Sequence, residues 1–112
     1  MDSKSFEQLL DEIDESRPFE NANGGRKADA GKVQLSLLPF DALETIARVM
    51  EFGAVKYGRD NWRNVEAVRY EDAMLRHFAA IQRGEFADSE SGLPHAAHMA
   101  CCAIFLTAKA GK

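Results

Sequence analysis

The amino-acid sequence predicts an all-α protein, a small helical bundle with one hydrophobic core. In three long segments the apolar residues recur at the helical period of about 3.6 residues, and no segment shows the alternation of a half-buried strand. The 112 residues are 46% hydrophobic and 29% charged, which is the composition of an ordinary globular domain. We therefore expect a single domain over residues 1–112.

A short acidic amphipathic helix is predicted first, within residues 1–16. Ser5 and Gln8 have the spacing of a capping box, and Pro18 follows the expected end of the helix. Residues 17–38 include "NANGG" and lack helical periodicity, which predicts a mobile loop. The apolar side chains of the first helix are Phe6, Leu9, Leu10 and Ile13.

The second helix is predicted from about Asp41 to about Tyr57, before Gly58. Asp41 and Glu44 have capping-box spacing, so Asp41 is expected to cap the helix. A glycine directly after the last periodic residue is a typical helix stop. The apolar stripe of this helix contains Leu43, Ile46, Ala47, Met50 and Ala54.

Two further helices complete the predicted bundle. The third runs from about Arg69 to Arg83 with Gly84 as its stop, and the last begins with Pro94 as its first helical residue. The last helix has a broad apolar surface, and its alanines allow close contact with another helix. Because a core of this size often needs a second copy, we expect the bundle to be completed by oligomerisation, as a dimer or higher oligomer.

Charge and hydropathy exclude two classes of partner. The formal net charge is -4, unlike the basic face of a duplex nucleic-acid-binding protein. No run of about 18 apolar residues is present, so we expect no membrane span and predict a cytoplasmic protein.

The neighbouring Cys101 and Cys102 are expected to be reduced thiols. A zinc site of Cys102 with His95 and His98 is disfavoured, because the chain has no CxxC motif.

Two histidines open the last predicted helix in the stretch "PHAAH". His95 and His98 are three residues apart, so their side chains share one face and can bind one ion. The positive end of the helix dipole also favours neutral imidazoles, which are the form that binds metal. The spacing alone leaves two alternatives open, hydrogen bonding at a helix end and polar contacts in an interface.

Polar groups on the third helix and in the following loop can meet these histidines. Asp72, Arg76 and His77 lie close together on the third helix, and the acidic loop contributes Asp88 among other carboxylates. Carboxylate oxygens suit Mg²⁺, and mixed oxygen and imidazole ligands also suit Mn²⁺. An ordinary surface ion pair between Asp72 and Arg76 remains the alternative for those two residues.

Several segments together resemble the dATP/dGTP diphosphohydrolase family, phage proteins of the MazG-like type. The segments, in order, are "GRKADAGK", "LLPFDALE", "FGAVKYGRDNW" and "YEDAMLRHFAAIQRGEFADSESGLPHAAHMACCAIFL", within about residues 24–107. The resemblance implies an all-α nucleoside triphosphate pyrophosphatase fold. It also implies metal-dependent hydrolysis of purine deoxynucleoside triphosphates to the monophosphate and pyrophosphate, in phage nucleotide-pool metabolism and hence in the host cytoplasm.

The chain departs from the wider MazG-like pattern in its metal ligands. Related enzymes typically hold magnesium with an ExxE pair and an ExxD pair of carboxylates, whereas this chain has "EDAMLRH" and "HAAH" at the corresponding places. We therefore expect Asp72, His95 and His98 to hold Mg²⁺ or Mn²⁺, and His77 or Asp88 to orient and deprotonate the attacking water.

Substrate contacts are expected from basic and aromatic side chains. Cationic groups neutralise a triphosphate, aromatic rings stack on a base, and a side-chain amide pairs with a purine edge. For the aromatic residues simple packing is the alternative. A noncatalytic helical protein that senses nucleotides or assembles with a partner is the alternative for the whole chain. The expected substrate-binding residues are Lys32, Lys56, Tyr57, Asn61, Trp62 and Arg76.

Overall fold

The computed structural model describes residues 19–20 and 24–111. The chain divides into two units, residues 1–37 and residues 38–112, and each unit is described by itself. The helix predicted within residues 1–16 lies outside the described residues. A single domain over the whole chain stays a prediction.

The described part of the first unit contains a small antiparallel strand pair. β1 (Phe19–Glu20) pairs with β2 (Arg26–Lys27), with Phe19 opposite Lys27 and Glu20 opposite Arg26. A 3₁₀ turn, η1 (Leu35–Leu37), follows. These short elements lie where the sequence predicts only a loop, because two-residue strands are too short to give a periodic pattern.

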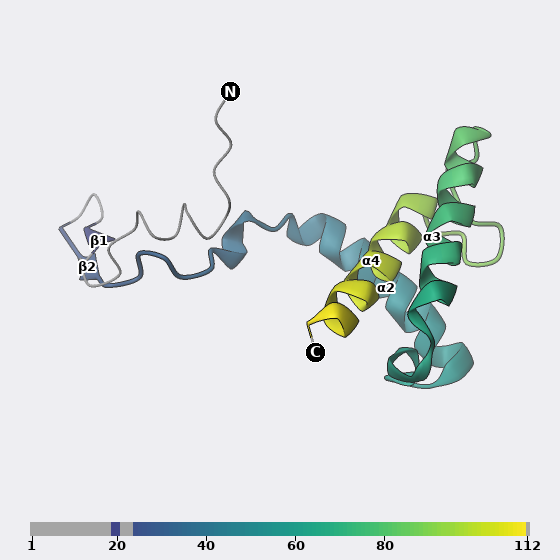
Figure 1. Cartoon of the computed structure of the whole chain (residues 1–112). Coiled ribbons are helices and arrows are strands. Elements are labelled where there is room, and N and C mark those ends of the chain that lie inside the picture. The colour runs from purple at the N-terminus through teal and green to yellow at the C-terminus, as the bar shows by residue number, and fades with distance from the viewer. Residues whose placement is uncertain (1–18, 21–23, 112) are drawn as a thin grey trace, which may run out of the picture. The chain divides into compact units, whose positions relative to one another are not determined.

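The second unit is made of helices. In order these are α2 (Phe40–Tyr57), the 3₁₀ turn η2 (Asn61–Asn64), α3 (Ala67–Gln82) and α4 (His95–Ala110). α4 packs against both α2 and α3 and also contacts η2 (Figure 1). The all-α class is therefore confirmed for this unit, and α4 is its central helix. No helix in the described residues is long and apolar enough to span a membrane.

The predicted helix ends agree with the structure within two residues, but Asp41 is not the cap of α2 and Pro94 is not the first residue of α4. The residue before α2 is Pro39, so Asp41 lies inside the first turn, where its Oδ1 accepts the N–H of Ala42 at 2.9 Å. Pro94 precedes α4 and has an extended ψ of 137°. Gly58 ends α2 as predicted and adopts a φ of 92°, which favours glycine.

The core of the helical unit is thin. It centres on Val49 of α2 with Ala97 and Cys101 of α4, and no described side chain is less than 2% exposed. Because these side chains are mostly small, α4 lies close to its neighbours, but little apolar area is buried. The partly buried residues packed around this centre are Ile46, Met50, Leu93 and Phe105.

Candidate active site

A cavity of about 700 Å³ lies among α2, η2, α3 and α4. This volume is typical of small-molecule sites, which usually measure about 300–1,000 Å³. Its lining combines apolar residues of α2 and α4 with many of the polar and aromatic residues expected from the sequence to act on a nucleotide. Those expected residues are Lys56, Tyr57, Asn61, Trp62, His77, Asp88 and His98.

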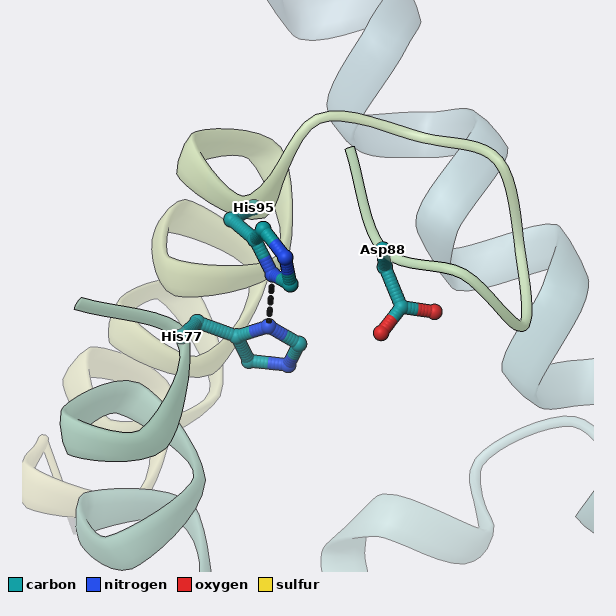
Figure 2. Close-up of side chains that lie close together, drawn as sticks. All are labelled: His77, Asp88 and His95. Atoms are coloured by element: carbon teal, nitrogen blue, oxygen red, sulfur yellow. Dashed lines mark hydrogen bonds between the residues drawn. The ribbon is translucent and has the colours of Figure 1, made fainter. Parts of the chain in front are cut away.

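Two imidazoles meet at one end of the helical unit. Nδ1 of His77 on α3 lies 2.8 Å from Nδ1 of His95, the first residue of α4 (Figure 2). A hydrogen bond between two ring nitrogens requires that one carry a hydrogen and the other a lone pair. The His95 ring is only 5% exposed, and its buried Nε2 has no hydrogen-bond partner.

Asp88 is fixed by the loop between α3 and α4. Its Oδ2 accepts the backbone N–H groups of Glu90 at 3.1 Å and Ser91 at 2.9 Å, and its own N–H donates to the Leu93 carbonyl at 2.8 Å. Gly92 makes the turn possible with a φ of 75°. Partial burial acts to raise the pKa of Asp88, but the bond from Ser91 and the nearby His98 outweigh it and lower that pKa. The carboxylate is therefore ionised and held in place.

His77, Asp88 and His95 form a cluster with the donor set of a metal site. One ligand atom from each residue lies within 4.8 Å of the other two. Figure 2 shows the two imidazoles in contact, with Asp88 facing them from the loop. Two neutral imidazole nitrogens and one carboxylate oxygen are ligands for a divalent cation. The side chains thus fit a metal ion, whose remaining coordination positions would be open to other ligands.

His98 lies directly beside this cluster. Its ring stacks on His77 with centroids 4.5 Å apart, and its Nε2 is 2.7 Å from Oγ of Ser91 and 4.0 Å from Oδ2 of Asp88. Burial is the main cause that lowers the pKa of both His77 and His98. Neighbouring histidines lower both pKa values further, against an opposing effect of Asp88. Both rings therefore favour the neutral state, which can accept a proton or bind a cation.

The buried cysteines have the properties of core residues. Cys101 and Cys102 are free and buried, as expected for reduced thiols. Burial, reinforced by Cys102, raises the pKa of the Cys101 thiol to about 12, and burial also raises the pKa of Cys102. Because the thiolate is the form that binds metal, these raised values disfavour a zinc site through Cys102.

Three of the expected site residues lie apart from the cluster and the cavity lining. Asp72 and Arg76 are exposed on α3, and neither lines the cavity or belongs to the three-residue cluster found in the described part of the chain. Asp72 precedes His77 by five residues, which turns it about 140° around the helix from His77. Lys32 is exposed and belongs to the first unit.

The two aromatic residues expected to stack on a base have different surroundings. The Trp62 ring stacks on Phe105 with centroids 4.5 Å apart and planes 9° apart, and the Arg63 guanidinium carbon lies 4.3 Å from its centroid. Tyr57 is 65% exposed, and Nζ of Lys56 lies 5.2 Å from its ring centroid. Tyr57 therefore offers the more accessible ring, whereas Trp62 is already packed.

Lys56 is the cationic side chain of the cavity that lies next to Tyr57. Its Nζ donates a hydrogen bond to Glu90, and this bond is the main cause that raises the pKa of Lys56, followed by a hydrogen bond with Tyr57. Lys56 is thus charged, and its partner Glu90 lines the same cavity.

Two polar residues around the cluster had no assigned role from the sequence. Ser91 accepts the N–H of Leu93 at 3.1 Å and contacts His98, while Oε2 of Glu85 lies 3.4 Å from Nε2 of His95. The run "DSESG" carries the signal for Ser91, since Asp followed closely by Ser and Gly is typical of a side-chain-capped turn. No comparable signal marks Glu85, whose position depends on the path of the loop.

Comparisons with known proteins agree on one family. The family model described as dATP/dGTP diphosphohydrolase, N-terminal, matches residues 22–112. A curated relative, the dATP/dGTP diphosphohydrolase of Salmonella phage PMBT28, is 42% identical over 82 residues, or 73% of this chain. The matched part is 28% of that relative, so the chain spans well under half of its length. No solved structure matches the chain.

Proposed function

Because the chain belongs to the family described as dATP/dGTP diphosphohydrolase, N-terminal, we propose that it hydrolyses purine deoxynucleoside triphosphates to the monophosphate and pyrophosphate. One observation carries this proposal. A single cavity of about 700 Å³ is lined by Lys56 and Tyr57 on α2 and by His77, Asp88 and His98 of the histidine and carboxylate cluster. A cationic group, a stacking surface and groups able to activate water are thus available to one ligand.

A divalent ion is part of the proposed reaction. A triphosphate carries about four negative charges, and water can attack its α-phosphorus only when that charge is neutralised. His77, Asp88 and His95 would hold the ion, which supplies this neutralisation when bound. The proposed ligand set keeps His95 of the expected set but replaces Asp72 and His98 by His77 and Asp88, which were expected to act on the attacking water. Asp72 is exposed and lies about 140° around α3 from His77.

We assign the remaining roles by position in the cavity. His98 is neutral, lines the cavity and lies 4.0 Å from Asp88, so it is placed to accept the proton of the attacking water. When a substrate binds, Nζ of Lys56 leaves the Glu90 carboxylate and donates its hydrogen bond to a phosphate oxygen instead. Tyr57 stacks on the purine, and Asn61 offers its amide to the base edge. Lys32 and Arg76 stay predictions for phosphate binding.

Product analysis tests the proposed reaction. The purified protein with Mg²⁺ or Mn²⁺ is expected to convert dGTP or dATP to the monophosphate and intact pyrophosphate in equal amounts, because attack is at the α-phosphorus. Anion-exchange chromatography of early time points identifies the products. Diphosphate with orthophosphate, or tripolyphosphate with nucleoside, would contradict the chemistry. Binding without turnover would favour the alternative of a noncatalytic nucleotide sensor.

The relative named above comes from a phage, which suggests a biological setting. We place the activity in phage nucleotide-pool metabolism, in the cytoplasm of the host cell. The substrate preference of that setting is testable in the same assay, since dCTP should turn over more slowly than the purine nucleotides. Stacking is the physical reason, because a purine covers more of an aromatic ring than a pyrimidine does.

A homo-oligomer is the proposed assembly. The core is thin, whereas Val55, Leu75 and Phe86 are 88%, 66% and 77% exposed. Apolar area of this kind gains free energy when a second copy covers it. Light scattering at micromolar concentration is therefore expected to give the mass of a dimer or a higher oligomer. A monomer mass under those conditions would refute this part of the proposal.

A further inference from the structure

The two ring nitrogens of His95 face different groups. Nδ1 lies 2.8 Å from Nδ1 of His77, whereas Nε2 lies 3.4 Å from Oε2 of Glu85 without making a hydrogen bond. His95 is 5% exposed, so Nε2 is shielded from bulk water. Buried polar atoms are nearly always satisfied, so a buried nitrogen 3.4 Å from a carboxylate oxygen points to a hydrogen bond between them after a small adjustment of Glu85.

The arrangement matches a histidine that binds metal through Nδ1. Such a ligand needs its lone pair on Nδ1 and its hydrogen on Nε2, and ligating histidines usually donate that second N–H to a carboxylate. Glu85 is the carboxylate on that side of His95, and its side chain is 56% exposed and therefore able to adjust. With this tautomer of His95, the Nδ1–H of His77 would be the donor in the observed contact between the two Nδ1 atoms. An ion held through both Nδ1 atoms would require the hydrogen of His77 to be on its Nε2 instead.

The donor set also indicates the kind of ion. Two ligands about 2.1 Å from one ion and at right angles to each other lie about 3 Å apart, close to the observed Nδ1 separation of 2.8 Å. Mg²⁺ strongly prefers oxygen ligands, whereas imidazole suits first-row transition metals and a carboxylate also suits Mn²⁺. A site with two nitrogens and one carboxylate therefore discriminates against Mg²⁺.

We propose that His77, Asp88 and His95 form a transition-metal site that takes Mn²⁺ or Co²⁺ in preference to Mg²⁺, with Glu85 holding His95 in the required tautomer. Glu85 is a positioning residue, because it acts through the His95 ring. The inference rests on the proposed function for the role of the ion beside the nucleotide cavity, but the site itself is a property of the free protein.

Metal binding without nucleotide tests the inference. Metal-free protein is titrated with Co²⁺ and Mn²⁺ by calorimetry, and the visible absorption of Co²⁺ changes when protein ligands replace its water. We expect saturable binding that is tighter for Co²⁺ than for Mn²⁺, as the usual order of affinities requires. A large excess of Mg²⁺ should not displace either ion. Displacement by Mg²⁺ at comparable concentration, or the absence of Co²⁺ binding, would overturn the proposal.

Variants of Glu85 test whether this residue positions the His95 ring or only adds negative charge to the surface. Glu85→Ala is expected to weaken Co²⁺ binding by about 10–100-fold, whereas Glu85→Gln, which keeps an oxygen acceptor, retains part of the affinity. Glu71→Ala is the matched control, because Glu71 is an exposed glutamate of α3 outside the cluster and the cavity lining. Equal affinity of Glu85→Ala and Glu71→Ala would remove Glu85 from the site. Thermal unfolding confirms that each variant is folded.

The outcomes also distinguish this inference from the proposed function. If Co²⁺ and Mn²⁺ bind as expected but no triphosphate is hydrolysed, the proposed function fails and the metal site stands. If triphosphates are hydrolysed with Mg²⁺ while Co²⁺ does not bind, the metal site fails and the proposed function stands.

Discussion

Replacing Asp88 by asparagine is expected to lower turnover of dGTP by at least about a hundredfold, because the change removes the negative ligand of the proposed ion. The asparagine oxygen can still accept the N–H groups of Glu90 and Ser91, which Asp88 binds at 3.1 and 2.9 Å. The loop should therefore keep its shape, and thermal unfolding should change little. Steady-state kinetics at saturating Mn²⁺ measures the effect.

The matched variant Asp72→Asn compares the ligand set expected from the sequence, which included Asp72, with the proposed set, which includes Asp88. Asp72 was expected from the sequence to bind the ion, but it is exposed on α3 and outside the cluster. We expect this variant to retain most of the activity of the unchanged protein. A loss as large as that of Asp88→Asn would return Asp72 to the site, and normal activity of Asp88→Asn would contradict the proposed ligands.

The helices were predictable because apolar residues recur at the helical period in each of them. Ile46 and Met50 of the expected stripe of α2 do pack around the core, but Val49, the buried residue of α2, lies outside that stripe. The caps were less predictable, because Asp41 is favourable both as a cap and in the first turn of a helix. The short strands β1 and β2 depend on a local turn and leave no periodic signal.

The candidate site was predictable in its residue types but not in its grouping. The spacing of His95 and His98 places both rings near the start of α4, and the structure does place both beside His77. Which carboxylate joins them depends on the rotation of α3 and on the fold of the following loop. Spacing along one helix gives neither, so Asp72 and Asp88 could not be distinguished from the sequence.

The contacts of Glu85 and Ser91 show the same limit. Both residues act on a histidine through the backbone path of the loop between α3 and α4, where His95 donates its N–H to the Phe86 carbonyl at 2.9 Å. Contacts of this kind join residues that the folded loop brings together, and these residues have no fixed spacing in the sequence. A local sequence pattern can suggest the turn, but it cannot show which side chain the turn directs toward an imidazole.

Replacing Tyr57 by alanine is expected to lower kcat/KM for dGTP by about 10–100-fold, because stacking on an aromatic ring contributes about 1–3 kcal/mol per base. Tyr57 is 65% exposed beside Lys56, so its removal should disturb the fold little. Tyr57→Phe keeps the ring and should retain most of the activity, which makes it the matched control. Because dCTP gains less from stacking, its rate should fall less than that of dGTP. Steady-state kinetics with both nucleotides decides this, and an equal loss for dGTP and dCTP would mean that Tyr57 does not stack on the base.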